Sequence, residues 1–224
     1  YRIHISRWLL VRYRHFIDFH KGITFVYILL LIWYFDAFNN QTIWVYLGLH
    51  GTYGILWVLK SRIFPDKSWD KKSSIAYGVL ILFGLSMYWV SPWIIVSGYF
   101  YDITPDSIQC APGWLISLSI FSFGLGVFLH FTSDMQKHTS LKLRSSALIT
   151  EGLFKKSRNM NYFGELLIYL SFASLSMHWI PFLILVIFIL SVWVPNMKKK
   201  DKSLSRYDDF DEYKRKSNLF FPFF

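Results

Sequence analysis

A single carboxylate interrupts the longest apolar stretch of the chain. Residues 162–195 span 34 positions and contain one charged residue, Glu165. A carboxylate at the centre of a bilayer costs about 2.5–3.5 kcal/mol on insertion scales and less near the interface, and such residues usually bind ligands or relay protons. The structural alternative is that Glu165 caps its helix, or pairs with Arg158 or with a basic residue of the C-terminal segment.

The segment that ends at Glu165 joins a basic loop to this apolar stretch. It reads SRNMNYFGE over residues 157–165. Asn161 can cap the helix, whose free backbone N–H groups attract phosphates or carboxylates. Gly164 permits close approach of a ligand or a neighbouring helix, and Arg158 adds positive charge. We therefore predict an anion-accepting pocket at the membrane surface.

A second polar pair lies in an earlier apolar stretch. His50 and Tyr53 are spaced i, i+3, so they share one helix face. Tyr53 could donate a hydrogen bond to a substrate carbonyl, with His50 tuning it. The alternative is that both residues make hydrogen bonds between helices, where Gly51 and Gly54 allow close packing.

Other types of site find little support in the sequence. The histidines lack the paired spacing of a zinc site, and we expect no metal. The single cysteine, Cys110, has no nucleophile constellation around it and no partner for a disulfide within the chain. No Gly-rich phosphate loop is present.

The positions of the apolar stretches predict an all-α polytopic membrane protein. The chain has 224 residues, of which 54% are hydrophobic, and a membrane-spanning helix needs about 20 apolar residues. Pro92 should end or kink the third stretch, and residues 178–181 should form a turn that divides the last one. The count is then six helices, or five if the last stretch is one helix. The five stretches are residues 23–38, 43–59, 74–100, 113–132 and 162–195.

The 24 basic residues test this topology independently. Five lie in residues 1–21, five in 60–73, six in 133–161 and eight in 196–224, while the intervening connections carry none. Because cytoplasmic loops are enriched in Lys and Arg, both termini should lie on one positive side, which is cytosolic or faces the mitochondrial matrix. The net charge of +10 is then explained by topology, and we expect no nucleic-acid partner. The endoplasmic reticulum and the mitochondrial inner membrane are not distinguished.

Residues 1–22 interleave basic and apolar residues, which predicts an amphipathic arm lying on anionic lipid. A solvated arm and the remnant of an organelle presequence are the alternatives. Residues 23–224 should form a single membrane domain. Because residue 1 is Tyr rather than Met, we expect further residues to precede it.

Several segments resemble one family of integral-membrane proteins. The stretch from GLF at residues 152–154 through SRNMNYFGE is similar to the "GLF…(S/T)R(H/N)PNY(F/L)GE" signature of proteins with a steroid 5α-reductase-type C-terminal domain, distant relatives of isoprenylcysteine carboxyl methyltransferases. The resemblance covers roughly residues 48–224, with Met160 in place of the usual Pro. Further similar segments are LHGTYG at 49–54, SDMQK at 133–137, and KDKSLSRY at 200–207 followed by Tyr213.

The resemblance implies a cofactor site in residues 133–224. The cofactor is NADPH in the reductase branch and S-adenosylmethionine in the methyltransferase branch. A lipid-binding basic segment is the alternative for residues 196–216. The positions that would face or close over the cofactor are Asp134, Lys137, Arg158, Asn161, Tyr162, Glu165, Asn196, Lys200, Asp201, Arg206, Tyr207 and Tyr213.

Three functions follow as hypotheses. The first is a membrane oxidoreductase that uses NADPH to reduce a lipophilic unsaturated substrate, with Tyr53 and His50 as catalytic residues. The family implies a Glu–Tyr pair in the N-terminal half for steroids, yet no Glu precedes Glu151, which argues against steroid reduction in particular. The second is a membrane methyltransferase. The third is an enzyme-like accessory subunit, whose partners would include other membrane subunits as well as lipids.

Overall fold

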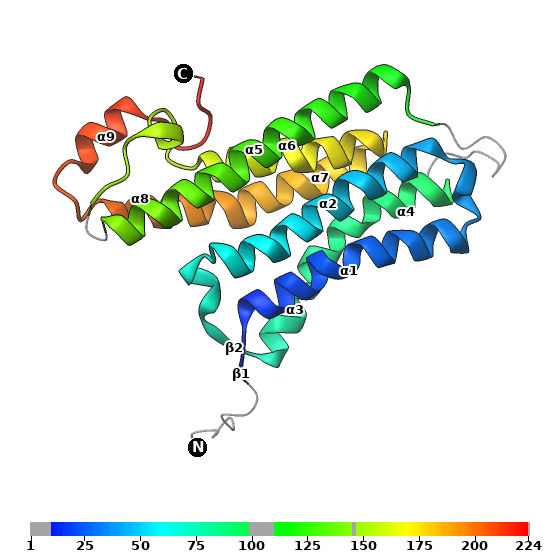
Figure 1. The fold of residues 1–224 in the computed structure, drawn as a ribbon, viewed down its shortest axis with the longest axis horizontal. Coiled ribbons are helices and arrows are strands. Elements are labelled where there is room, and N and C mark those ends of the chain that lie inside the picture. The colour runs from blue at the N-terminus through cyan, green and yellow to red at the C-terminus, as the bar shows by residue number, and fades with distance from the viewer. Residues whose placement is uncertain (1–9, 99–109, 145–146, 224) are drawn as a thin grey trace. The chain divides into compact units, whose positions relative to one another are not determined.

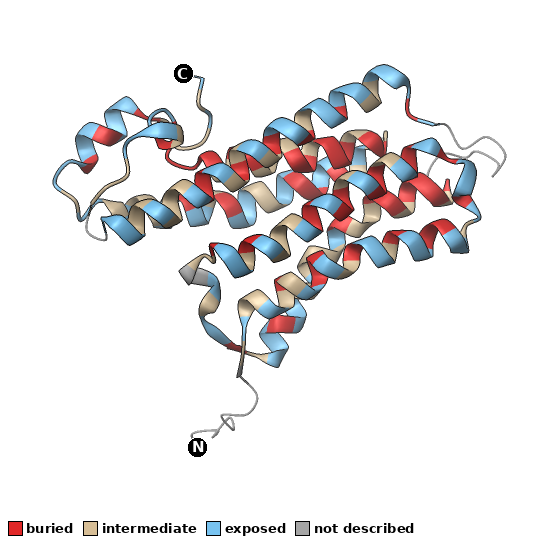
Figure 2. Cartoon of the chain, in the orientation of Figure 1, coloured by how far each residue is buried: buried red, intermediate tan, exposed pale blue. Residues whose placement is uncertain are grey.

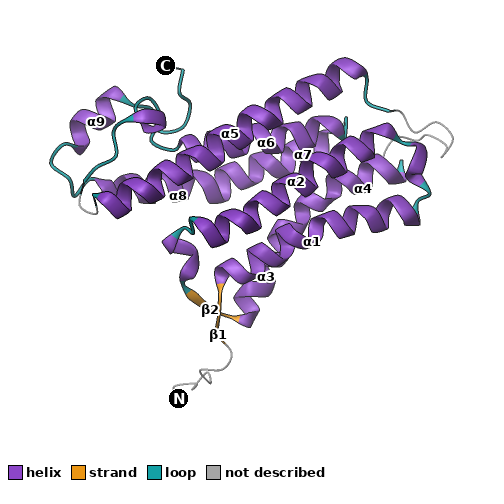
Figure 3. Ribbon diagram, in the orientation of Figure 1, coloured by secondary structure: helices purple, strands orange, loops and turns teal. Residues whose placement is uncertain are grey.

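The computed structural model describes residues 10–98, 110–144 and 147–223, with backbone only at positions 67 and 68. The chain forms two compact units, Tyr1–Cys110 and Ala111–Phe224. Helices make up most of the described structure (Figures 1 and 3). The division at residue 110 separates the stretch that contains His50 from the stretch that contains Glu165.

The first unit is built on three apolar helical paths in its described residues, which are connected by short 3-10 turns and a two-stranded ribbon. Asn40 caps α2, because its side chain accepts hydrogen bonds from the backbone N–H groups of Thr42 (2.9 Å) and Ile43 (3.3 Å). Pro65 follows the end of α2. The elements are β1 (Leu10–Arg12), α1 (Tyr13–Tyr34), η2 (Ala37–Asn39), α2 (Gln41–Ile63), η3 (Lys67–Asp70), β2 (Lys72–Ser74), α3 (Ile75–Ser86), η4 (Met87–Trp89) and α4 (Val90–Ser97).

Two features of this unit differ from the sequence expectations. Helix α1 begins at Tyr13, so the expected boundary at residue 22 between an interfacial arm and the membrane lies inside a continuous helix. The first nine residues of the expected arm lie outside the described residues. The short strand β1 pairs antiparallel with β2, in the register Leu10 with Ser74, a contact between segments 64 positions apart that periodicity does not reveal.

The third apolar stretch forms one helical path with a local defect. Pro92 lacks a backbone N–H, and the turn before it, η4, is a 3-10 helix that joins α3 to α4. The path ends at Gly98, whose φ of 60° is the left-handed conformation favoured by glycine. Pro92 therefore follows a local change in helix type and does not end the helix, so that alternative of the prediction is wrong, and a kink at Pro92 stays a prediction.

The second unit carries a hairpin of long helices and a short C-terminal segment that folds back. Its elements are α5 (Gly113–Leu143), η6 (Gly152–Phe154), α6 (Met160–Leu175), α7 (Trp179–Phe188), the π-helical turn η7 (Ile189–Trp193), α8 (Val194–Leu204) and α9 (Phe210–Lys216). Helix α5 continues eleven residues beyond the predicted end at residue 132, so Asp134 and Lys137 lie on a helix and not in a loop.

The predicted turn at His178 is confirmed. Met177 takes a left-handed conformation with a φ of 49°, and the His178 Nδ1 atom accepts a hydrogen bond from the Ile180 backbone N–H at 3.2 Å. Pro181 follows in the first turn of α7. The last apolar stretch is therefore two helices.

Five helical paths in the described chain are long and apolar enough to cross a membrane: Tyr13–Tyr34, Gln41–Ile63, Ile75–Ser97, Gly113–Leu143 and Trp179–Leu204. Helix α6 is shorter, with 16 residues. The fold is therefore an all-α polytopic membrane fold, and a sixth crossing by α6 stays a prediction. In both units buried side chains line the helix faces that meet, while large apolar residues cover the outer faces (Figure 2).

Candidate functional site

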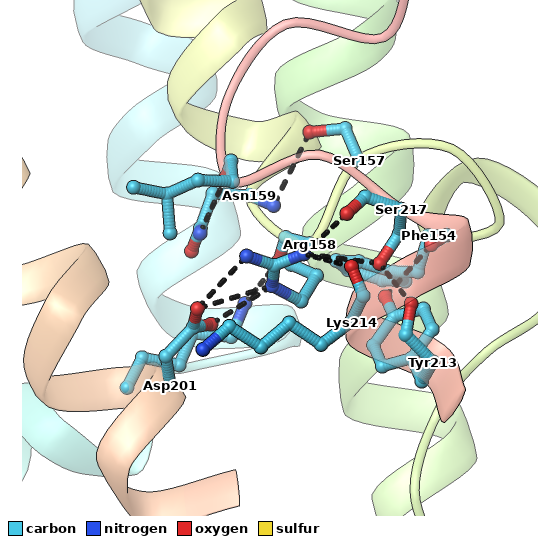
Figure 4. A network of polar contacts seen from close by, with 10 residues as sticks. Phe154, Ser157, Arg158, Asn159, Asp201, Tyr213, Lys214 and Ser217 are labelled. Atoms are coloured by element: carbon cyan, nitrogen blue, oxygen red, sulfur yellow. Dashed lines mark hydrogen bonds and ion pairs between the residues drawn. The ribbon is translucent and has the colours of Figure 1, made fainter. Parts of the chain in front are cut away.

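A buried arginine holds the C-terminal segment of the second unit in place (Figure 4). Arg158 lies between η6 and α6, and its side chain is 5% exposed. Its Nε atom lies 3.0 and 3.2 Å from the two carboxylate oxygens of Asp201 on α8, and its Nη2 atom lies 2.9 Å from Oδ2. Its Nη1 atom donates to the backbone carbonyl and hydroxyl oxygens of Ser217. All three guanidinium nitrogens are thus engaged within the protein.

The backbone beside Arg158 pairs with the segment that follows α9. Arg158 donates its backbone N–H to the carbonyl of Asn218 (2.9 Å), and Asn218 donates to the carbonyl of Lys156 (2.9 Å), which forms a short parallel bridge. The Ser157 hydroxyl donates to the Phe220 carbonyl at 2.7 Å, and the Asn159 side chain donates to the Leu219 carbonyl at 2.8 Å. We call residues 156–159 and 217–220 together the clamp.

Two more side chains connect α8 and α9 to the clamp region. Lys200 donates to the Arg158 carbonyl at 2.6 Å. The Tyr213 hydroxyl donates to the Phe154 carbonyl at 2.7 Å, and burial raises the pKa of Tyr213 to about 12. The aromatic ring of Phe163, in the first turn of α6, meets three phenylalanine rings of the C-terminal segment edge-on, at centroid distances of 5.6–6.3 Å.

A depression of about 400 Å³ lies beside the clamp. Four of its eight lining residues are basic, and Asp201 supplies one carboxylate. Since Asp201 is bound to Arg158, the lysines supply most of the charge available to a ligand. The lining residues are Arg158, Lys198, Asp201, Lys202, Ser205, Phe210, Lys214 and Leu219.

Helices α5 and α6 approach each other very closely at two glycines. A Cβ atom on Gly164 would lie 2.4 Å from the backbone nitrogen of His130, and one on Gly126 would lie 2.7 Å from the Gly164 carbonyl oxygen. The Nδ1 atom of His130 lies 3.0 Å from the Asn161 carbonyl oxygen, so that nitrogen carries the proton in this contact. Its Nε2 atom lies 3.9 Å from the carboxylate of Asp134, which is buried one turn later.

This packing places three predicted residues around one helix crossing. Asp134 and Asn161 both face His130, the former by its carboxylate and the latter by its backbone carbonyl. Glu165 lies one turn after Asn161 and is half-buried. Asn161 occupies the first turn of α6 and does not cap it, because the N-cap position belongs to Asn159. The start of α6 lies next to the clamp, because the Asn159 side chain donates to the Leu219 carbonyl, and its role in binding an anion stays a prediction.

Of the remaining predicted cofactor residues, some are half-buried in the second unit and others are exposed. The ring of Tyr162 contacts Trp193 at a centroid distance of 5.5 Å, and Lys137 is half-buried on α5. Asn196 and Arg206 are exposed, and Arg206 contacts the hydroxyl and the ring of its neighbour Tyr207. The structure thus gathers Arg158, Lys200, Asp201 and Tyr213 at the clamp, and it does not bring Asn196, Arg206 or Tyr207 into it.

The motif segments at residues 133–137 and 152–154 touch each other. The side chain of Gln136 donates to the Glu151 carbonyl at 2.8 Å and accepts from the Leu153 N–H at 3.1 Å. Gly152 has a φ of 59° and lies against the same Gln136 side chain. These contacts fix the loop that leads into Arg158.

In the first unit, His50 and Tyr53 lie in the core between α1 and α2. Tyr53 is fully buried, and the Nδ1 atom of His50 lies 3.0 Å from the Tyr46 hydroxyl. The rings of His50 and Tyr53 are 6.5 Å apart, so the observed hydrogen bond links His50 to Tyr46. The ammonium of Lys21 lies 4.5 Å from the centre of the Tyr53 ring.

The glycines next to His50 and Tyr53 pack closely against α1, as expected if the two residues have a structural role. A Cβ atom on Gly54 would lie 2.2 Å from the Lys21 carbonyl oxygen, and one on Gly51 would lie 2.5 Å from the Phe25 ring. The close helix approach is therefore real. A role of Tyr53 or His50 in catalysis stays a prediction.

The sequence reading missed His130, Ser217 and the lysines at positions 198, 202 and 214 as members of this region. The i, i+4 spacing of His130 and Asp134 on an apolar helix was a signal that could have drawn attention to His130. Ser217 gives no such signal, because its partner lies 59 positions away.

The comparisons with known proteins give one match. Residues 75–224 match a family model described as 3-oxo-5-alpha-steroid 4-dehydrogenase. That range contains the whole second unit and helices α3 and α4, and it excludes His50 and Tyr53. Neither the curated proteins nor the solved structures gave a match.

Proposed function

Because this chain belongs to the 3-oxo-5-alpha-steroid 4-dehydrogenase family, we propose that it is a membrane reductase that uses NADPH on a lipophilic α,β-unsaturated carbonyl compound. The family indicates a reductase-like membrane protein. The observation that carries the finer proposal is the basic depression beside the clamp, within the matched residues. Its lysines and the fixed backbone around Arg158 suit a ligand with several phosphates.

The residues present fit the phosphate-rich part of NADPH. Lys198, Lys202 and Lys214 line the depression from α8 and α9, and lysine binds phosphate as a compact point charge. Arg158 is a positioning residue in this proposal, because its guanidinium is already used by Asp201 and Ser217. It fixes α8 relative to the start of α6 and so sets where the lysines point.

The polar groups at the α5–α6 crossing would hold a less charged part of the cofactor. Asp134, the Asn161 side chain and Glu165 offer carboxylate and amide groups, which bind ribose hydroxyls or a carboxamide. NADPH, when bound, supplies a hydride. What the chain must then add is a proton at the substrate oxygen or carbon, and Tyr53 stays the predicted donor.

A binding experiment in detergent tests this proposal. We expect the purified protein to bind NADPH, and the double variant Lys198→Ala/Lys202→Ala to bind it about tenfold more weakly, because charge-assisted contacts are lost. Lys199→Ala is the matched control, since Lys199 is exposed on the same helix but does not line the depression. Its affinity should remain close to that of the wild type.

Two outcomes would count against NADPH, and a third would count against the depression as its site. Binding of S-adenosylmethionine alone would favour the methyltransferase hypothesis. Binding of neither molecule, with co-purification of a defined membrane complex, would favour the accessory-subunit hypothesis. Equal loss of affinity in the Lys199→Ala control would show that binding follows general charge rather than this depression.

A turnover assay shows whether the protein is an enzyme or only binds the cofactor. With NADPH and a panel of lipophilic enones, we expect oxidation of the cofactor that depends on the enone. Tyr53→Phe should lower kcat with little change in NADPH affinity if Tyr53 donates the proton. An unchanged kcat in that variant would exclude Tyr53 and leave the reductase proposal standing.

A further inference from the structure

A small cavity with charged residues in its lining lies in the first unit, at the ends of two membrane-spanning helices. It has a volume of about 20 Å³, which is room for one water-sized group. Helix α1 contributes Arg14 and Asp18 from its first two turns, and α2 contributes Lys60 and Ser61 from its last turn. The full lining is Arg14, Ile17, Asp18, Trp57, Lys60, Ser61, Pro65, Asp66 and Trp69.

One carboxylate oxygen of Asp18, a residue that lines this cavity, lacks a hydrogen-bond donor. The Oδ2 atom of Asp18 accepts a hydrogen bond from the Ser61 hydroxyl at 2.6 Å. The Oδ1 atom is buried and has no hydrogen-bond partner within the protein. A buried acceptor without a donor costs free energy, so a small hydrogen-bond donor bound at this site would be stabilising. A cationic donor would bind the carboxylate most strongly.

The charges around Asp18 are balanced. Arg14 and Lys60 supply two positive groups, and Asp18 and Asp66 supply two negative ones. Arg14 also forms an ion pair with Asp70 at 3.3 Å, and the ammonium of Lys60 lies 4.7 Å from the centre of the Trp57 ring. A lining that carries charges of both signs suits a ligand that carries both signs.

We propose that this cavity binds the headgroup of phosphatidylethanolamine. The primary ammonium is water-sized and has three N–H donors, so it fits this partly open space and donates to the Asp18 Oδ1 atom. The lipid phosphate lies toward Arg14 and Lys60. The cavity is at the ends of α1 and α2, where the headgroups of the basic face would lie. This inference is independent of the proposed reductase activity.

A series of lipids with increasingly methylated headgroups tests this proposal on the wild-type protein. We expect lipid retention, measured by native mass spectrometry, to fall from phosphatidylethanolamine through its mono- and dimethyl forms to phosphatidylcholine, because N–H donors are lost and the group outgrows the cavity. Loss of a charge-assisted hydrogen bond corresponds to about a tenfold or greater difference between the ends of the series. Equal retention across the series would overturn the proposal and indicate that water fills the cavity.

A variant at Asp18 tests whether the preference for the unmethylated headgroup arises at this cavity. Asp18→Asn keeps the shape of the side chain but removes its charge, and it should flatten the methylation series. Asp208→Asn, an exposed carboxylate of the second unit, should leave the series unchanged. A preference that persists in Asp18→Asn would show that the ethanolamine binds elsewhere. If Asp18→Asn fails to fold, equal retention across the wild-type series would still overturn the proposal.

Discussion

Arg158 and Asp201 lie 43 positions apart in the chain and form a two-pronged ion pair, with three nitrogen–oxygen distances of 2.9–3.2 Å. The arginine side chain is 5% exposed and the aspartate side chain 16%. Because a buried charge is costly without its partner, this pair makes the positions of α6 and α8 mutually dependent.

Removing either member of this pair should destabilise the second unit. Arg158→Ala leaves Asp201 without its guanidinium, which we expect to cost about 3–5 kcal/mol. The double variant Arg158→Ala/Asp201→Ala should cost less than the sum of the two single changes, because it leaves no lone charge. Thermal unfolding in detergent measures both, and Arg206→Ala, which removes an exposed arginine, should have little effect. Additive losses would show that the two side chains do not interact.

The glycine contact between α5 and α6 predicts a pair of opposite results. Gly164→Ala places a methyl group 2.4 Å from the His130 backbone nitrogen, and we expect a loss of about 1–3 kcal/mol from overpacking. Gly124→Ala has nothing within 4 Å of the added Cβ atom. It should leave the melting temperature unchanged or raise it slightly, because alanine favours helix. Equal effects of the two substitutions would contradict the observed packing.

Tyr213 predicts a stability change at high pH. Burial raises its pKa to about 12 in the folded protein, against 10.0 for a free tyrosine. The protonated form is therefore favoured by folding, and its stabilisation is complete below about pH 10 and is lost as the pH rises toward 12. Tyr213→Phe removes the hydrogen bond to the Phe154 carbonyl, at a cost of about 1 kcal/mol. The melting temperature should then fall less steeply between pH 10 and 12 than in the wild type, and equal slopes would refute this role.

The single cysteine tests the predicted membrane orientation. Cys110 is exposed and lies in the connection without basic residues, which the positive-inside rule places opposite the basic face. In sealed cells or vesicles, an impermeant maleimide should label Cys110 only from the side opposite the basic loops. Cys110→Ser/Lys199→Cys moves the thiol to α8 and should reverse the pattern. Labelling of both proteins from one side would refute the orientation.

The features that the sequence revealed were local. The turn at His178 was predictable because a cap residue and Pro181 fall together inside an apolar stretch too long for one helix. The glycines at 51, 54 and 164 indicated close helix approach, and the structure confirms it. The length of α5 was underestimated because polar residues after 132 continue the helix, and hydropathy marks where a membrane ends rather than where a helix ends.

The features that were missed depend on distant contacts. Arg158 was assigned to a cofactor because its charge looked available beside an apolar helix. Its partners Asp201 and Ser217 lie 43 and 59 positions later, and no spacing rule reports such a meeting. The contact of His130 with Asn161, 31 positions away, was missed for the same reason, although its i, i+4 spacing from Asp134 was a local signal. A pattern of residue types shows which groups can interact, and tertiary packing decides which of them do.

The separation between Arg158 and its partners also has a consequence for biosynthesis. A membrane protein is made from its N-terminus, so α6 emerges before α8 and α9 exist. During that interval the arginine has neither Asp201 nor Ser217 to neutralise it and must stay in water or be held by another protein. Final assembly of the depression is therefore a late event, and a chain stalled after α7 would present an unmatched charge that cellular quality control could detect.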